Sequence, residues 1–156
     1  MNNLVMRPAR RDDLQVIVDL LADDPLGSTR EAAGPPFDPV YDAAFTAIDE
    51  DPNQYLAVAE LESGVVGVLQ LSFIPGLSRK GLWRGQIESV RVQRGLRSKG
   101  LGRVMFEWAI DTCRARNCGL VQLTTDASRQ DAHTFYESLG FSATHHGYKL
   151  NLCPPK

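Results

Sequence analysis

A short segment in the second half of the chain combines glycine with basic residues: Arg94-Gly95-Leu96-Arg97-Ser98-Lys99-Gly100-Leu101-Gly102. A strand-like run at 86–92 precedes it, and an amphipathic helical pattern from about 101 to 117 follows it. In this order the backbone N–H groups of the loop and of the first helical turn point toward one place, where the helix dipole adds partial positive charge. Four full positive charges lie on or beside the loop, those of Arg94, Arg97, Lys99 and Arg103. The segment therefore predicts a site for an anion, and we expect a phosphorylated cofactor there.

Two well-known glycine-rich phosphate loops do not fit this segment. A Walker loop has a lysine after its second glycine, and Leu101 stands at that position. A Rossmann loop has a third glycine, and Met105 stands at that position. The pattern that remains is Arg-x-x-Gly-x-Gly, formed by Arg97, Gly100 and Gly102. A nucleotide-binding hydrolase is thereby disfavoured, and the alternative to a phosphate loop is a plain strand–helix turn with solvated charges.

The length of 156 residues indicates one domain over residues 1–156. The contents of 43% hydrophobic and 23% charged residues are ordinary for a globular protein. The net charge of −2 argues against a dedicated nucleic-acid binder. We expect no membrane segment, because the longest apolar runs fall far short of about 20 residues. The three cysteines are odd in number and have no zinc-ligand spacing, so we expect no metal site and a cytoplasmic protein with free thiols.

The elements that must position the loop follow from the hydrophobic periodicity. Strands are expected at 4–7, 54–61, 65–74, 86–92, 120–125 and 141–152. Helices are expected at 11–23, 41–49, 101–117 and about 128–139, the last opened by a capping box at 128–131. The stretch 24–39 is rich in glycine and proline and is expected to be a loop. The chain therefore predicts an α/β or α+β fold with a sheet of mixed polarity.

Three segments in this order resemble the GNAT superfamily of N-acetyltransferases. They are the opening Met6-Arg7-Pro8-Ala9 before an acidic helix start, the loop at 97–102, and the closing Phe135-Tyr136-Glu137-Ser138-Leu139-Gly140-Phe141. The resemblance covers nearly the whole chain. It implies a mixed central sheet flanked by helices, with acetyl-CoA between splayed fourth and fifth strands.

The resemblance also implies which residues bind the cofactor. Backbone groups of Val90 and Val92 would bind the pantetheine arm of acetyl-CoA. The pyrophosphate would be held by Arg97, Ser98, Lys99, Gly100, Leu101 and Gly102. Asp126 stands where relatives often carry an asparagine that contacts the cofactor, so it either makes that contact or caps the following helix.

Transfer of an acetyl group to an amine requires a base, since a free alkylamine has a pKa near 10. Glu88 is the candidate base, acting directly or through a water molecule. It shares strand parity with Val90 and Val92, which predicts apolar neighbours that make a carboxylate more basic. The alternatives are an ion pair with Arg84 or Arg91, or a bulge that turns Glu88 outward.

Tyr136 is the candidate acid, because it matches the family position whose phenol often protonates the departing CoA sulfur. The alternative is a core aromatic on the helical face of Phe135 and Leu139. The sequence thus predicts an N-acetyltransferase that moves acetyl from acetyl-CoA to a primary amine of a small molecule. The amine attacks directly in a ternary complex. The alternative function is a catalytically inactive acyl-CoA-binding regulatory module. Dimers are common in the family, so a homodimer is compatible with the resemblance.

Overall fold

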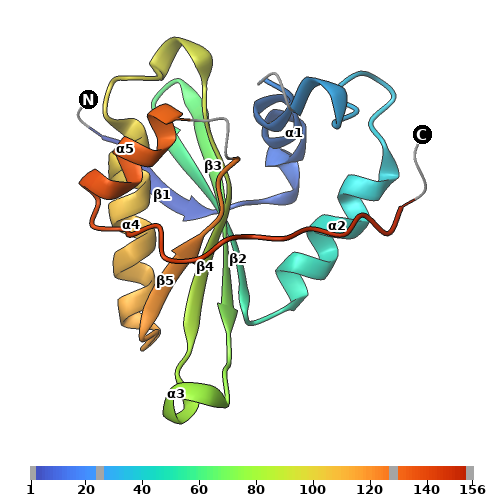
Figure 1. The fold of residues 1–156 in the computed structure, drawn as a ribbon. Coiled ribbons are helices and arrows are strands. Elements are labelled where there is room, and N and C mark those ends of the chain that lie inside the picture. Colours follow the sequence, from blue (N-terminus) through green and yellow to red (C-terminus); the bar gives the residue numbers. More distant parts are fainter. Residues whose placement is uncertain (1–2, 24–26, 127–129, 154–156) are drawn as a thin grey trace. The chain divides into compact units, whose positions relative to one another are not determined.

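Five strands form one mixed sheet in the computed structural model, which describes residues 3–23, 27–126 and 130–153 (Figure 1). The strands are β1 (Val5–Pro8), β2 (Gln54–Leu61), β3 (Gly64–Ile74), β4 (Arg84–Val92) and β5 (Leu120–Leu123). They lie in chain order, with β1 to β4 antiparallel and β5 parallel to β4. The chain divides into two compact units, Met1–Leu123 and Thr124–Lys156, and the sheet belongs to the first.

Helices cover both faces of this sheet. The covering helices are α1 (Leu14–Ala22), α2 (Pro39–Glu50) and α4 (Leu101–Ala115). The short α3 (Ser78–Gly81) lies between β3 and β4, and the second unit contains α5 (Gln130–Ser138). Short 3-10 turns lie at Arg11–Asp13, Gly27–Thr29 and Arg94–Leu96. Figure 1 shows α1 and α2 on one side of the sheet and α4 on the other. Helix α4 carries the chain from β4 to the parallel β5, as such a pair requires. Among the helices of the described residues, none has the length and apolarity to cross a bilayer.

Close packing against β3 and β4 fixes the position of α4. Met105, Ala109 and Cys113 are fully buried at helical spacing on its inner face. Glycines face them: a Cβ on Gly67 would lie 2.9 Å from the Met105 sulfur, and a Cβ on Gly85 would lie 2.3 Å from the Cys113 sulfur. The sheet therefore admits α4 at close range, which places the N-terminus of the helix beside the end of β4.

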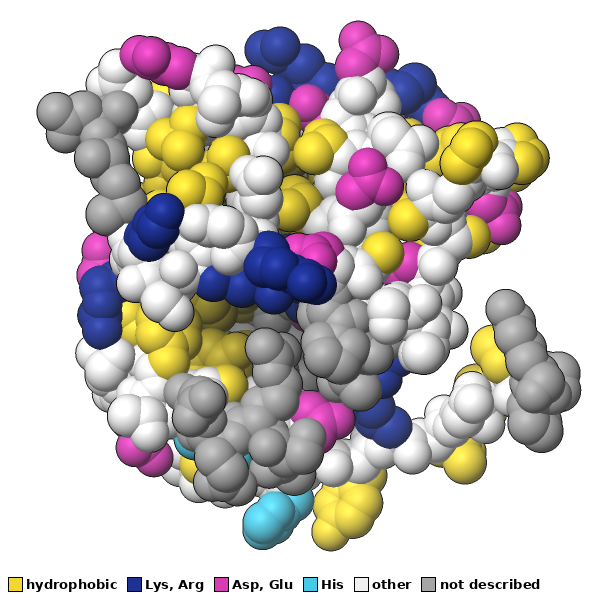
Figure 2. Space-filling model, turned by 90° about the horizontal axis from the view of Figure 1, so that it is seen from above, with side chains coloured by type: hydrophobic (Ala, Val, Ile, Leu, Met, Phe, Trp, Pro, Cys, Tyr) yellow, Lys and Arg dark blue, Asp and Glu magenta, His cyan; other side chains and the backbone are white. Residues whose placement is uncertain are grey.

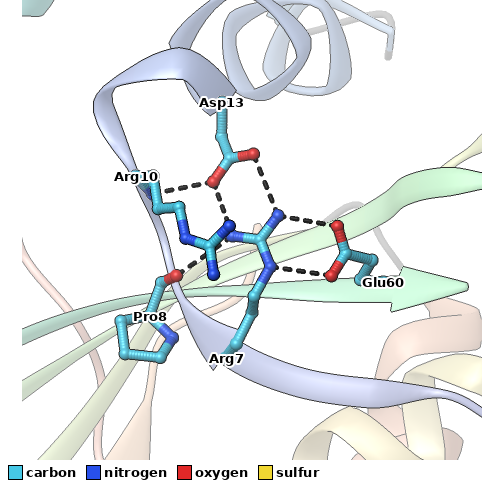
Figure 3. Close-up of polar contacts among 5 residues, drawn as sticks. All are labelled: Arg7, Pro8, Arg10, Asp13 and Glu60. Atoms are coloured by element: carbon cyan, nitrogen blue, oxygen red, sulfur yellow. Dashed lines mark hydrogen bonds and ion pairs between the residues drawn. The ribbon is translucent and has the colours of Figure 1, made fainter.

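A charged network joins β1, the turn before α1, and β2 (Figure 3). The Arg7 guanidinium donates to both carboxylate oxygens of Asp13, at 2.7 and 3.0 Å, and to both of Glu60, at 2.8 Å each. Asp13 also accepts the Arg10 backbone N–H at 2.7 Å. These Arg7 contacts hold the pKa values of the Asp13 and Glu60 carboxyl groups below their usual range. Arg7, part of the opening segment of the family resemblance, therefore anchors the edge of the sheet.

The predicted mixed sheet with flanking helices is confirmed, and five of the six expected strands are present. Helix α2 begins earlier than expected, at Pro39, because the Asp38 side chain accepts the Val40 N–H and proline is tolerated at the first helical position. The capping box expected at 128–131 falls partly outside the described residues.

The prediction of a strand at 141–152 is wrong, since the structure describes all these residues and none is in a strand. The prediction depended on apolar residues that alternate with polar ones, at Tyr148, Leu150 and Leu152. These side chains are 94%, 85% and 87% exposed, so they form no buried face. Alternation defines an apolar face, but a strand also needs a neighbour for its backbone hydrogen bonds.

Candidate functional site

The pairing of β4 with β5 ends halfway along β4. Arg84 to Ile87 lie opposite Leu120 to Leu123, and β4 then continues to Val92. Within the part of the chain that the structure describes, no strand pairs with this side of β4 beyond Ile87. This is the separation of the fourth and fifth strands that the family resemblance implies, and the space beside β4 beyond Ile87 is called the opening below.

A bulge interrupts β4 inside this opening. Glu88 lies opposite Gln70, whereas Arg91 lies opposite Val68, and Ser89 between them has a φ of 55°. The extra residue breaks the alternation of strand faces, so Glu88 no longer shares a face with Val90 and Val92 as the sequence predicted. The Glu88 side chain is exposed. The prediction that apolar side chains surround this carboxylate is therefore wrong. The alternative, a bulge that leaves Glu88 exposed, is what the structure has. The catalytic role of Glu88 stays a prediction.

The backbone of β4 offers polar groups to the opening. Gln93 donates its N–H to the Val66 carbonyl at 2.8 Å, so the polar groups of Val92, one residue earlier, point away from β3. The Val92 carbonyl accepts the Arg97 Nε–H at 2.9 Å, and the Val90 carbonyl accepts from Arg91 Nη1 at 2.9 Å. The two carbonyls expected to meet a cofactor thus already accept guanidinium donors, with a second lone pair left on each.

The loop between β4 and α4 presents unpaired backbone amides. Among the hydrogen bonds of the described residues, none is donated by the backbone N–H groups of residues 98–102, and the first bond of α4 runs from the Val104 N–H to the Gly100 carbonyl. Ser98 and Gly100 have positive φ values of 61° and 85°, so the loop turns sharply before the helix. Leu101 is buried and holds the start of α4 against the core. Free N–H groups at the positive end of a helix dipole suit a phosphate or diphosphate.

The basic side chains around this loop are less free than the sequence suggested. Arg94 and Arg97 both form ion pairs with Asp23, at 2.6 and 3.0 Å, and Arg103 lies 3.8 Å from Glu107. Figure 2, which views this end of the molecule, shows Lys and Arg side chains next to carboxylates. Of the four expected charges only Lys99 has no carboxylate partner among the described residues. The backbone amides are therefore the stronger anion-binding feature. Sequence reasoning missed Asp23 because it lies 71 residues before Arg94.

Tyr136 belongs to the second unit, on α5, and is half-buried. Its ring lies 5.5 Å from the Phe135 ring and 6.3 Å from the Phe141 ring, and its carbonyl accepts the Phe141 N–H at 3.1 Å. Tyr136 therefore packs against other aromatic rings of this unit, as the alternative to a catalytic role predicted. Glu88 lies in the other unit, and the role of Tyr136 as an acid stays a prediction. Among the described residues, no group of three or more His, Cys, Asp or Glu side chains is arranged to hold a metal ion.

Comparison with known proteins gives consistent matches. Residues 15–141 match the model of the acetyltransferase (GNAT) family. Over 95 residues the chain is 30% identical to the aminoalkylphosphonate N-acetyltransferase of Salmonella typhimurium, with 61% of each chain covered. Over 89 residues it is 34% identical to the glucosamine 6-phosphate N-acetyltransferase of Trypanosoma brucei brucei, covering 56% of this chain and 58% of that one. These alignments span about three-fifths of each relative.

A solved structure matches over a greater length. The crystal structure described as a transcriptional regulator from Bacillus halodurans is 43% identical, with a TM-score of 0.93. The match covers 96% of this chain and 100% of that one.

Proposed function

This chain belongs to the acetyltransferase (GNAT) family, and from that membership and the loop geometry we propose that it moves an acetyl group from acetyl-CoA to a primary amine of a small molecule. The observation that carries the proposal is the row of amides at residues 98–102, at the start of α4 and beside the end of β4. Within the described ranges these amides have no hydrogen-bond acceptor, and this side of β4 has no pairing strand. Residues 1–156 act as one catalytic domain, since the family match crosses the boundary between the two units. Free thiols at Cys113, Cys118 and Cys153 favour a cytoplasmic location.

The residues present fit acetyl-CoA as co-substrate. The segment from Arg97 to Gly102 holds the pyrophosphate through the backbone amides of residues 98–102. Gly100 has open space where a Cβ would stand, so the backbone can approach the phosphates closely. Backbone groups of Val90 and Val92 bind the pantetheine arm along the open side of β4. Their carbonyl oxygens can take a ligand N–H beside the arginine donor that each already has.

The chemistry needs no covalent enzyme intermediate, because both substrates are held together. Glu88 removes a proton from the acceptor ammonium, directly or through a water molecule that its exposed position admits. The amine nitrogen attacks the thioester carbonyl and the C–N bond forms. The nitrogen then loses its second proton to solvent water, and the C–S bond breaks. A backbone N–H near Val90 stabilises the oxygen as charge develops on it. The Tyr136 hydroxyl gives a proton to the departing thiolate.

Small-molecule amines are favoured as acceptors because two of the matched relatives carry such an acceptor in their names, an aminoalkylphosphonate and glucosamine 6-phosphate. A second candidate function is a catalytically inactive acyl-CoA-binding regulatory module. The description of the 43% identical structure as a transcriptional regulator favours it. Both functions use the same loop and differ only in turnover.

Two measurements, made one after the other, test these proposals. The first is thermal unfolding with CoA, acetyl-CoA or ATP, where stabilisation by the CoA species and not by ATP is expected. The second is release of free thiol from acetyl-CoA with a panel of amines that includes aminoalkylphosphonates and amino sugar phosphates. Turnover with any amine supports the enzyme, and tight acetyl-CoA binding without turnover supports the regulatory module. Absence of stabilisation by every CoA species contradicts both.

A further inference from the structure

The end of α1 is tied to the loop by a residue that the sequence pattern did not single out. Asp23 is the C-terminal cap residue of α1. Its carboxylate accepts from Arg94 Nη2 at 2.6 Å and from Arg97 Nη2 at 3.0 Å, and its backbone carbonyl accepts from Arg97 Nη2 at 2.6 Å. Arg97 also donates its Nε–H to the Val92 carbonyl at 2.9 Å. One guanidinium thus joins the end of α1 to the end of β4.

The loop has few other connections to the rest of the first unit. Its backbone bonds are internal, from the Leu96 N–H to the Gln93 carbonyl and from the Arg97 N–H to the Arg94 carbonyl. Gln93 is bonded to β3 at the start of the loop, and Leu101 is buried at its end. Among the described residues, the polar contacts between this stretch and another helix are those that Asp23 receives from Arg94 and Arg97. Asp23 therefore anchors the middle of the loop.

We propose that Asp23 is a positioning residue for the phosphate-binding loop: through Arg97 it holds the loop in the conformation in which the amides of residues 98–102 are open to the pyrophosphate. The inference rests on the proposed function, because that function supplies the ligand. Arg97 is the main connection, since its side chain is 39% exposed against 75% for Arg94. A loop held in its binding conformation before the ligand arrives loses less entropy on binding.

In the opposite assignment, the Asp23 carboxylate competes with the pyrophosphate for the guanidinium groups of Arg94 and Arg97. The geometry disfavours it, because two of the three bonds of Arg97 go to backbone carbonyls, those of Val92 and Asp23. A phosphate would replace only the carboxylate contact and would leave the guanidinium where it is. The two assignments predict opposite changes in CoA affinity when the carboxylate is removed.

The test compares Asp23→Asn with Asp19→Asn, which makes the same charge change one turn earlier on α1. Asp19 is exposed and contacts the Gln15 side chain on its own helix. For Asp23→Asn we expect the CoA dissociation constant and the KM for acetyl-CoA to rise about threefold to tenfold, with kcat unchanged at saturating acetyl-CoA. For Asp19→Asn we expect neither to change. Unchanged or tighter CoA binding in Asp23→Asn overturns the inference.

A double-mutant cycle separates an effect through Arg97 from a general one. If Asp23 acts through Arg97, then Asp23→Asn has no further effect on CoA affinity in an Arg97→Ala background. Equal effects of Asp23→Asn in both backgrounds contradict the assignment.

Amide hydrogen exchange of the ligand-free protein gives a readout that does not depend on CoA. Asp23→Asn is expected to speed exchange of the hydrogen-bonded amides of Gln93, Leu96, Arg97 and Val104, while Asp19→Asn leaves them unchanged. Unchanged exchange in Asp23→Asn overturns the inference. If the wild-type protein does not bind CoA, the proposed function fails by itself, and the exchange rates alone decide whether Asp23 holds the loop.

Discussion

Glu88 of β4 lies opposite Gln70 of β3, one residue before a bulge in which Ser89 has a φ of 55°. The bulge adds one residue to β4 relative to β3 before the next pair, Arg91 with Val68. A bulge of this kind bends the strand and re-aims its side chains. Glu88 is consequently an exposed carboxylate at the point where β4 loses its pairing with β5.

Replacement of Glu88 by glutamine removes the base and keeps the shape of the side chain. If Glu88 accepts the proton of the amine, Glu88→Gln lowers kcat by about 100-fold and leaves the KM for acetyl-CoA nearly unchanged. Steady-state thiol release with an accepted amine measures both constants. Glu62→Gln, at an exposed turn position, is the matched control and should behave as wild type. Wild-type turnover in Glu88→Gln would remove this residue from the mechanism.

Replacement of Tyr136 by phenylalanine separates the two roles weighed for its side chain. The ring contacts with Phe135 and Phe141 survive the change, and only the hydroxyl is lost. A role as the acid predicts that kcat falls by about 100-fold with little change in melting temperature. Tyr148→Phe removes a hydroxyl from a 94% exposed position and serves as the control. A purely packing role predicts the same turnover in both variants.

Some parts of the site could be predicted from sequence because they depend on local patterns. Met105, Ala109 and Cys113 recur every four residues, and all three are buried on α4. The loop before this helix was predicted from its glycines, and Gly100 does adopt a positive φ of 85°. Both features are determined by residues close together in the chain.

Other parts depend on contacts that no local pattern encodes. Asp23 meets Arg97 across 74 residues of sequence, and nothing near either residue indicates the pair. The bulge at Ser89 interrupts a period of two that sequence reasoning takes as constant. Tyr148 and Leu150 alternate as in a strand, but the pairing that would make one is absent from the described segment. Partner choice, strand register and bulges are set by tertiary packing rather than by propensity.

Two glycines in the same loop allow a test of its backbone conformation. A Cβ on Gly100 or on Gly95 meets nothing within 4 Å, but only Gly100 has a positive φ. Gly100→Ala should lower the free energy of unfolding by about 1–2 kcal/mol through backbone strain and should weaken CoA binding. Gly95→Ala should change neither. Urea unfolding and calorimetric titration with CoA measure the two effects. Equal behaviour of the two variants would contradict a conformational requirement at Gly100.

The Arg7–Asp13 pair predicts a stability that depends on pH. The Arg7 hydrogen bonds to its side chain hold the pKa of Asp13 below its ordinary value. A carboxyl group with a lowered pKa in the folded state contributes stability above its unfolded pKa of about 3.9, and this is lost as the pH falls through the folded value. Asp13→Asn should therefore lower the free energy of unfolding at pH 7 by about 2–3 kcal/mol, since it leaves a mostly buried guanidinium with one carboxylate fewer.

The difference in the free energy of unfolding between the wild type and Asp13→Asn should shrink as the pH is lowered from 5 toward 3. The reason is that the carboxyl group of Asp13 becomes protonated over this range. Urea unfolding at several pH values in this range measures it. Asp12→Asn is the control, since Asp12 is the exposed neighbour in the same turn. A difference that stays constant down to pH 3 would mean that the contribution of Asp13 comes from its shape and its bond to the Arg10 N–H rather than from its charge.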